Sequence, residues 1–210
     1  MGGDFWDFLA ADGRVGLLVA DVSGHGVPAA LVASMVKVAF EAQRGRAAEP
    51  AEVMAAMNAL LCRVLAGPFV TAVYASVSPA EGRLRFAGAG HPPALLWRAA
   101  AGQVERLNEN GLVMGFDEAA CYQAGEVPVE AGDRLLLFTD GLIETTNARD
   151  EMFGLEGLER TLAEGAGLKT EALADRLLAE LGRHRGVEGF EDDLTLLVAD
   201  VLPVAAAPAG

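Results

Sequence analysis

The sequence predicts an α+β fold built on antiparallel β-sheets, and two observations carry this prediction. Short apolar runs bounded by turn residues, which indicate strands, occur in blocks, and so do the longer runs with helical spacing. The strict alternation of strand and helix that a doubly wound parallel sheet requires is missing. The 210 residues suit one domain, which we expect at 1–202, followed by a disordered tail at 203–210. The abrupt start at "MGGDFWD" suggests that the domain's N-terminal edge is cut from a longer protein.

The first third of the chain is expected to form a hairpin and then two helices. The runs at 5–9 and 15–20 flank Asp12-Gly13, a dipeptide that favours a tight turn. Because 15–20 is apolar throughout, we expect a strand that is covered on both faces. A proline suited to the first helical turn opens each of the two helices that follow, at 28–44 and 50–65.

The rest of the chain is expected to supply further strands and two more helices. Three closely spaced strands are predicted to form an antiparallel meander, at 69–77, 83–90 and 93–98. Beyond them the pattern predicts strands at 134–140 and 192–202 and helices at 155–162 and 170–185.

Composition and charge exclude several functional classes. A net charge of −14 argues against nucleic acid and against an anionic membrane surface as partners. All apolar runs are shorter than the ~18 residues of a membrane helix, and no secretory signal is visible. Cys62 and Cys121 lack metal-binding spacing, so we expect two buried, small apolar residues of a protein in a reducing cytoplasm.

Carboxylates stand at the margins of several apolar strands. The acids in question are Asp4, Asp21, Asp140 and the pair Asp192-Asp193. Gathered at one end of a sheet, they would repel one another and raise each other's pKa values, a conflict that divalent cations resolve. Because every candidate donor is an oxygen, Mg²⁺ or Mn²⁺ fits better than zinc or copper. Two such ions can activate a water and hold a phosphoryl oxygen.

The spacing alone leaves a plainer interpretation open. Asp is a common turn and cap residue, and Asp140-Gly141 has the form of a simple turn. Each acid taken singly therefore fits a structural role as well as a metal-binding one.

Six sequence blocks favour the metal site. They are "GGDFWD", "ADVSGHGVPAAL", "FVTAVYASV", "FAGAGHPPALL", "LLLFTDGLIETTN" and "DDLTLLV". In this order they resemble the metal-dependent protein serine/threonine phosphatases related to protein phosphatase 2C. More narrowly, the chain resembles the bacterial branch of stage II sporulation protein E and the sigma-B regulator phosphatases. The resemblance implies two antiparallel β-sheets sandwiched between helical layers, and hydrolysis of phosphoserine or phosphothreonine by metal-activated water without a phosphoenzyme.

The resemblance also implies a role for each acid. Asp21 would bridge two Mn²⁺ or Mg²⁺ ions and so be the central catalytic residue, with the backbone carbonyl of Val22 facing one ion. Asp140 and Asp192 would complete one metal site, and Asp4 would serve the other directly or through water. Asp193 and Gly141 are expected just outside the ligands, with Asp193 orienting its neighbour.

The sequence departs from the wider superfamily at the position of the candidate general acid, and His25 fits two roles. Ser23 stands where eukaryotic relatives place a candidate general acid, and His25 follows two residues later. His25 can protonate the leaving serine oxygen or can simply be a turn residue. His91, in "GHPP", is expected to brace a turn. No N-terminal arginine that would grip a substrate phosphate is identifiable.

The resemblance implies a bacterial, cytoplasmic signal-transduction enzyme of stress-response sigma-factor regulation. Its substrate would be a phosphorylated protein, namely an anti-sigma-factor antagonist in a partner-switching pathway. An upstream sensor domain in the same longer chain would act through the helices at 28–44 and 50–65, with homodimerisation as a further possibility. Those helices also fit a simple packing role. The alternative function is a catalytically silent pseudophosphatase that binds a regulatory partner; the acids retained at all four places favour the enzyme.

Overall fold

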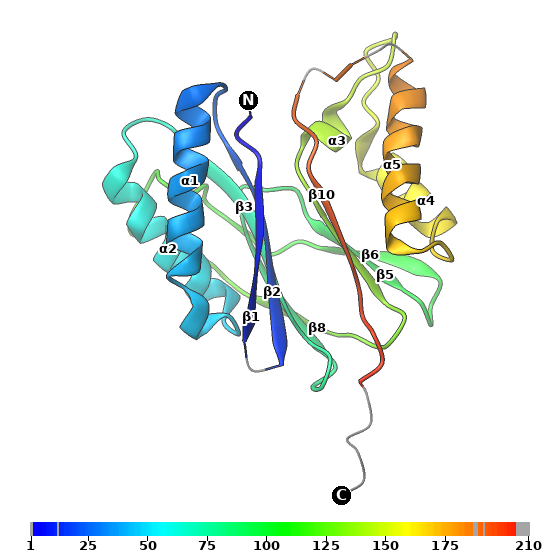
Figure 1. The fold of residues 1–210 in the computed structure, drawn as a ribbon, viewed down its shortest axis with the longest axis horizontal. Helices are drawn as coiled ribbons and strands as arrows, with labels where there is room; N and C mark the ends of the chain where they lie inside the picture. Colours follow the sequence, from blue (N-terminus) through cyan, green and yellow to red (C-terminus); the bar gives the residue numbers. More distant parts are fainter. Residues whose placement is uncertain (1, 12, 187–188, 191, 205–210) are drawn as a thin grey trace, which may run out of the picture.

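Two β-sheets packed face to face, with helices on the outer side of each, make up the protein (Figure 1). The structure is a computed structural model that describes residues 2–11, 13–186, 189–190 and 192–204. The predicted α+β architecture of two sheets between helical layers is confirmed. Of the expected tail at 203–210, only Pro203 and Val204 fall within the described residues, and both are exposed.

The first sheet contains six strands in the order β1-β2-β3-β4-β7, with β8 paired to β4. Their bounds are Phe5–Ala11 (β1), Arg14–Val22 (β2), Val70–Ser78 (β3), Arg83–Ala89 (β4), Asn110–Gly111 (β7) and Gly125–Pro128 (β8). All the pairings are antiparallel except the short one between β4 and β7, which is parallel.

The second sheet contains four antiparallel strands in the order β10-β9-β5-β6. Their bounds are Ala94–Arg98 (β5), Gln103–Leu107 (β6), Arg134–Phe138 (β9) and Leu196–Asp200 (β10). β1 and β10, the first and last strands, are therefore outer strands of different sheets (Figure 1).

Helices cover both sheets. α1 (Val27–Glu41) and α2 (Pro50–Val64), joined through the short 3₁₀ turn η1 (Arg44–Arg46), cover the first sheet. The second sheet is covered by α3 (Gly141–Glu144), α4 (Gly154–Glu164) and α5 (Thr170–Arg185). Three apolar clusters fill the spaces: one under α1 and α2, one between the sheets and one under α3 to α5.

The hairpin at the start of the chain forms as its sequence predicts. Ala11 pairs with Arg14, and Gly13 has a φ of 73°, which a residue without Cβ adopts at little cost. β2 is covered on both faces. Leu18 and Ala20 lie in the cluster under α1 and α2, whereas Leu17 and Val19 lie in the cluster between the sheets.

The predicted three-stranded meander is wrong at its third strand. β3 and β4 pair, but after Gly90 and His91 the chain leaves the first sheet, and β5 pairs with β6 and β9 in the second. Sequence spacing cannot distinguish a hairpin from a crossover of similar length. The strands β6, β7 and β8 and the helix α3 were not expected. The last strand begins at Leu196, not at Asp192.

The cysteine prediction holds only in part. Both thiols are free, Cys62 is partly buried, and Cys121 is exposed instead of buried. In the described part of the chain, no helix is both long and apolar enough to span a bilayer.

Candidate metal centre

Asp4 and Asp21 meet at one end of the first sheet because β1 and β2 are antiparallel. Phe5 pairs with Ala20, which places Asp4 and Asp21 just beyond that pair. The Val22 amide donates to the Gly3 carbonyl at 3.3 Å and so continues the ladder past the acids. Two carboxylates far apart in the sequence are thereby held on adjacent strands.

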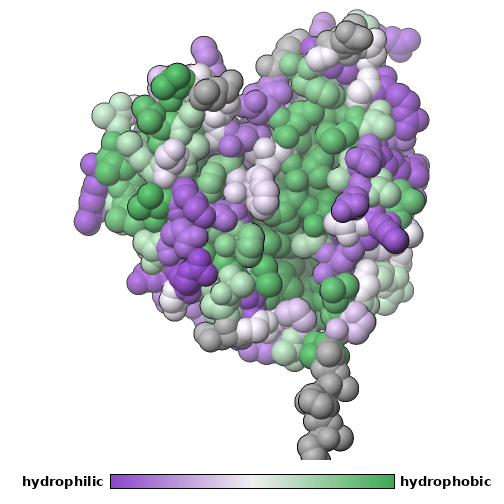
Figure 2. All heavy atoms as spheres, viewed as in Figure 1, coloured by the Kyte–Doolittle hydropathy of each residue, from purple (hydrophilic) through white to green (hydrophobic). Residues whose placement is uncertain are grey.

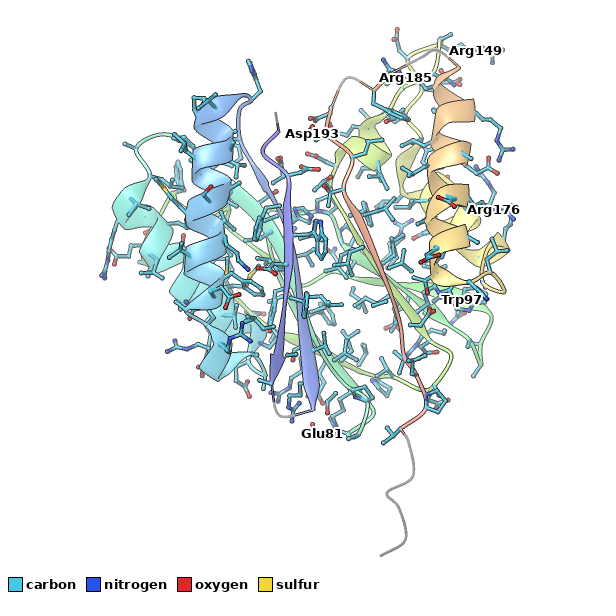
Figure 3. The ribbon with its side chains drawn as sticks, viewed as in Figure 1. Glu81, Trp97, Arg149, Arg176, Arg185 and Asp193 are labelled. Atoms are coloured by element: carbon cyan, nitrogen blue, oxygen red, sulfur yellow. The ribbon has the colours of Figure 1, made fainter. Side chains whose placement is uncertain are left out.

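The second sheet brings its acids to the same end. Phe138, the last residue of β9, pairs with Leu196, the first residue of β10. The next step of the ladder is a 3.0 Å hydrogen bond from the Thr139 amide to the Thr195 carbonyl. Asp140 follows Thr139 directly in the chain, and Asp192 and Asp193 lie shortly before Thr195. Figure 3 shows Asp193 at this end of the molecule, between the ends of the two sheets.

The Thr139 hydroxyl joins the two pairs of strands. It donates to Asp4 Oδ2 at 2.7 Å and accepts from the Thr195 amide at 3.1 Å. Because Thr139 itself is fully buried, this hydroxyl has little freedom to choose other partners. The start of β1 in one sheet is thereby tied to the ends of β9 and β10 in the other.

Glycines allow the chain segments to approach closely at this point. A Cβ on Gly2 would overlap the Asp193 carboxylate, and one on Gly3 would overlap the Val22 carbonyl oxygen. A Cβ on Gly141 would overlap the Asp193 carbonyl. Gly3 and Gly141 are thus needed for backbone approach around the acids, whereas Gly2 leaves room for the Asp193 side chain.

The acids perturb one another strongly. Burial raises the pKa of Asp21 from 3.8 to about 7, with further contributions from the negative charges of Asp4, Asp140 and Asp192. Burial also raises the pKa of Asp4, although hydrogen bonds from Thr195 and Thr139 oppose the shift. The Asp4 and Asp21 carboxyls each perturb the pKa of the other. Two carboxylates coupled in this way need either a shared proton or a cation between them.

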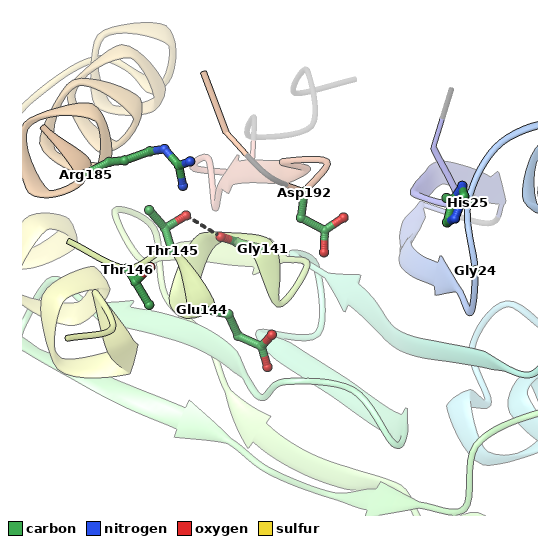
Figure 4. A pocket seen from close by; sticks show the side chains of 8 residues that line it. All are labelled: Gly24, His25, Gly141, Glu144, Thr145, Thr146, Arg185 and Asp192. Atoms are coloured by element: carbon green, nitrogen blue, oxygen red, sulfur yellow. Dashed lines mark hydrogen bonds between the residues drawn. The ribbon is translucent and has the colours of Figure 1, made fainter. Parts of the chain in front are cut away.

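A cavity of about 510 Å³ opens beside the acids. It is lined by Gly24, His25, Gly141, Glu144, Thr145, Thr146, Arg185 and Asp192. Figure 4 shows His25 facing Asp192 across this cavity, with Glu144 below and Arg185 reaching in from the end of α5. Burial, together with the charges of Asp140 and Asp192, raises the pKa of Glu144. The cavity is therefore acidic on its floor and carries an arginine at its rim.

The donor set fits hard divalent cations. The acids, the Val22 carbonyl and the hydroxyls around them supply oxygen only, which is the donor type that Mg²⁺ and Mn²⁺ prefer. Among the residues that the structure describes, no three acidic, histidine or cysteine side chains already enclose a single point. An ion here would therefore take part of its coordination from main-chain oxygen and water, as Mg²⁺ commonly does.

The structure brings most of the predicted site residues to one place. Asp4, Asp21, Val22, Asp140, Gly141, Asp192 and Asp193 all lie at the shared end of the sheets. His25 is exposed and lines the cavity from the opposite side. Sequence analysis missed Thr139, Thr195 and Glu144. The two threonines carried a signal, since each places a hydroxyl beside an acid at the end of an apolar strand.

The comparisons with known proteins place this architecture among the phosphatases of the protein phosphatase 2C type. The SiaA-PP2C domain of Pseudomonas aeruginosa superposes with a TM-score of 0.85 at 24% identity, covering 95% of this chain and 80% of that one. The RsbU and RsbW domains of a Mycobacterium tuberculosis protein superpose with a TM-score of 0.80 at 29% identity, covering 94% of this chain and 55% of that one.

The family model of stage II sporulation protein E (SpoIIE) matches residues 11–202, and the chain belongs to this family. Phosphoserine phosphatase RsbU of Bacillus subtilis is 30% identical over 204 residues, which cover 94% of this chain and 59% of that protein. Phosphoserine phosphatase RsbP of the same organism is 27% identical over 207 residues, covering 96% and 49%. The chain thus spans about half to three-fifths of the length of these relatives.

Proposed function

We propose that this chain is a metal-dependent protein phosphatase that hydrolyses phosphoserine. The observation that carries the proposal is the convergence of Asp21 with Asp4, Asp140 and Asp192, which leaves Asp21 with a pKa of about 7. A fold that gathers uncompensated carboxylates at one end of its sheets carries a stability cost, and a pair of bound cations would remove that cost. The relatives RsbU and RsbP are named phosphoserine phosphatases.

In this proposal two Mn²⁺ or Mg²⁺ ions would be held by Asp21, with Asp140 and Asp192 serving one ion and Asp4 the other. The Val22 carbonyl would complete the set. When bound, the ions supply an activated water and neutralise charge on the phosphoryl group. RsbX, which shares the fold with a TM-score of 0.69 at 18% identity, was solved in complex with magnesium.

The chain's own residues then orient the phosphoester. The water gives up one proton to the solvent as its oxygen bonds to phosphorus, the bond from phosphorus to the serine oxygen breaks, and the serine oxygen takes up a proton. His25 is placed to donate this proton, because it lines the cavity opposite Asp192. Arg185, also on the cavity wall, supplies positive charge near the substrate phosphate in a chain of net charge −14.

We propose an anti-sigma-factor antagonist phosphorylated on serine as the protein substrate, in a partner-switching pathway of the cytoplasm. The support is similarity to RsbU and to a Mycobacterium tuberculosis protein that carries RsbU and RsbW domains in one chain. The relatives' additional length is where an attached sensor domain would lie.

The regulatory input is proposed to arrive on the outer surface of α1 and α2. A cavity of about 450 Å³ between these helices is lined mainly by apolar residues, and five of them are markedly exposed: Leu31, Met35, Val38, Leu60 and Val64. Figure 2 shows hydrophobic residues at the surface on the side of α1 and α2. A sensor domain or a second copy of the chain would cover this surface. Because α1 begins only six residues beyond Asp21, a shift of the helix would move the bridging carboxylate.

Metal-dependent turnover tests the proposal. We expect p-nitrophenyl phosphate and a phosphoserine peptide to be hydrolysed in Mn²⁺ or Mg²⁺, and hydrolysis to stop with chelator or in Asp21→Asn and Asp140→Asn. Asp175→Asn, an exposed acid on α5, is the control for loss of one charge. Equal rates with chelator present would refute the mechanism. A chain that binds the phosphopeptide and Mn²⁺ but releases no phosphate in a single turnover would be a pseudophosphatase.

A further inference from the structure

His91 occupies the point where the chain crosses from one sheet to the other. β4 ends at Ala89 in the first sheet, and β5 begins at Ala94 in the second. Gly90, with a φ of 63°, turns the chain at the start of the crossover. His91 follows with only 3% of its surface exposed, which is unusual for a titratable residue in a connection.

Both ring nitrogens of His91 are hydrogen-bonded, each to a different sheet. Nε2 lies 2.9 Å from the Phe138 carbonyl oxygen at the end of β9. A carbonyl can only accept, so Nε2 carries the proton and donates. Nδ1 is then the acceptor for the Thr71 hydroxyl of β3, also at 2.9 Å. Burial lowers the pKa of His91 to about 4, so this neutral tautomer is kept at physiological pH.

The main chain of His91 is fixed as well. Its carbonyl accepts from Asn110 Nδ2 at 2.9 Å, and its amide donates to Asn110 Oδ1 at 3.4 Å. The backbone from which the ring projects is therefore held in place, and the ring itself is held by its two partners.

Each partner of the ring lies close to a candidate metal ligand, one across a strand pair and the other along the chain. Thr71 is the cross-strand partner of Asp21 in the register of β2 and β3. Phe138 lies two residues before Asp140, and between them Thr139 holds Asp4 by its hydroxyl. The imidazole thus spans the gap between β3, the neighbour of the strand that presents Asp21, and β9, the strand that ends two residues before Asp140.

We propose that His91 is a positioning residue, which fixes the ends of the two sheets at the separation that lets Asp21 and Asp140 share the same ions. A water or a flexible side chain would leave this separation variable, whereas a planar ring bonded at both nitrogens defines it. The proposal rests on the proposed function, because it assumes that the acids bind cations. It goes beyond bracing a turn, since the two partners of the ring lie in different sheets.

Measuring the metal affinity of variants distinguishes a positioning role for His91 from a simple packing role. His91→Phe keeps the ring's bulk and removes both hydrogen bonds. Thr71→Val removes only the bond to Nδ1 while keeping the shape, and Thr71→Ser restores a hydroxyl. Tyr74→Phe is the matched control, because the buried Tyr74 hydroxyl donates at 2.7 Å to the Ala47 carbonyl, remote from the acids.

Mn²⁺ dissociation constants from calorimetry and unfolding free energies in chelator are measured for each variant. We expect His91→Phe to weaken Mn²⁺ binding ~10-fold or more, as removing a residue that orients a metal ligand commonly does, and Thr71→Val by a smaller factor. Thr71→Ser should recover most of the affinity. Tyr74→Phe should lose stability but bind Mn²⁺ within a factor of about two of the wild type.

Three outcomes would overturn the proposal. The first is a folded His91→Phe or Thr71→Val variant that binds Mn²⁺ like the wild type, and the second is a Tyr74→Phe variant that loses as much affinity. If His91→Phe fails to fold, the comparison of Thr71→Val with Thr71→Ser decides. The third outcome, a wild-type chain that binds no Mn²⁺ at all, is distinguishable because it removes the proposed function together with this inference.

Discussion

Asp21→Asn should make the metal-free protein more stable while removing its activity. The Asp21 carboxylate is partly buried and faces the charges of Asp4, Asp140 and Asp192, so ionising it without a cation is costly. Asparagine has nearly the same shape and can still donate a hydrogen bond to Asp4. The substitution therefore removes a repulsive charge without leaving a cavity or an unpaired carboxylate.

The size of the effect follows from the pKa of Asp21. The rise from 3.8 to about 7 converts to about 4 kcal/mol at most, and partial exposure reduces this to roughly 1–2 kcal/mol. Because the folded pKa is above the unfolded one, the wild type keeps this stability below pH ~4 and loses it as the pH rises through ~7. The variant should thus match the wild type at pH 4 and exceed it at pH 8.

Thermal unfolding in chelator at these two pH values tests the reasoning. A gain of 1–2 kcal/mol corresponds to roughly 3–6 °C in Tm for a chain of this size. Asp175→Asn, which removes an exposed acid, should leave Tm nearly unchanged at both pH values. With saturating Mn²⁺ the order should reverse, since only the wild type binds the ions fully. An Asp21→Asn variant that is less stable than the wild type at pH 8 without metal would refute the repulsive cluster.

Three further predictions concern other parts of the molecule. Gly141→Ala should weaken Mn²⁺ binding in calorimetry, because its Cβ would overlap the Asp193 carbonyl, whereas Gly167→Ala meets only open space and should not. Asp200→Asn should lower the free energy of unfolding by about 1–3 kcal/mol in denaturant unfolding, because it leaves the buried Arg134 guanidinium without its carboxylate partner. Arg134 lowers the pKa of Asp200, so the difference in stability between the variant and the wild type should shrink as the pH falls below ~4. Ca²⁺ should not replace Mn²⁺ in phosphate release, because it prefers larger and looser coordination, and equal rates with the two ions would contradict the proposed centre.

The sequence predicts those helices, strands and turns whose residue pattern lies within one short stretch of the chain. The hairpin at 11–14, the apolar strand β2 and the proline-opened helices all depend on neighbouring residues, and they occur within a few positions of where they are expected. The assignment of β5 failed because a crossover between sheets and a turn within one sheet need similar residues. Only tertiary packing, here the placement of His91 between Thr71 and Phe138, decides between them.

The candidate site is predictable to a similar extent. The four aspartates can be recognised in the sequence because a charge at the end of an apolar strand is energetically costly. Glu144 cannot, because it lies on α3, a short helix that the sequence pattern does not predict. Thr139 and Thr195 looked like ordinary strand residues. Their importance lies in one hydroxyl that reaches Asp4 from the other sheet, which no linear pattern encodes.

The placement of the acids at the junction of two sheets links folding to metal binding. Neither sheet holds all the candidate ligands, since Asp4 and Asp21 lie at the end of the first, and Asp140 and Asp192 at the end of the second. Apolar packing between the sheets must therefore hold the like charges together before any cation arrives. Ions that bind only the packed arrangement would add RT ln(1 + [L]/Kd), about 2.7 kcal/mol at a hundredfold excess over Kd. A displacement of one sheet against the other would then change metal affinity directly.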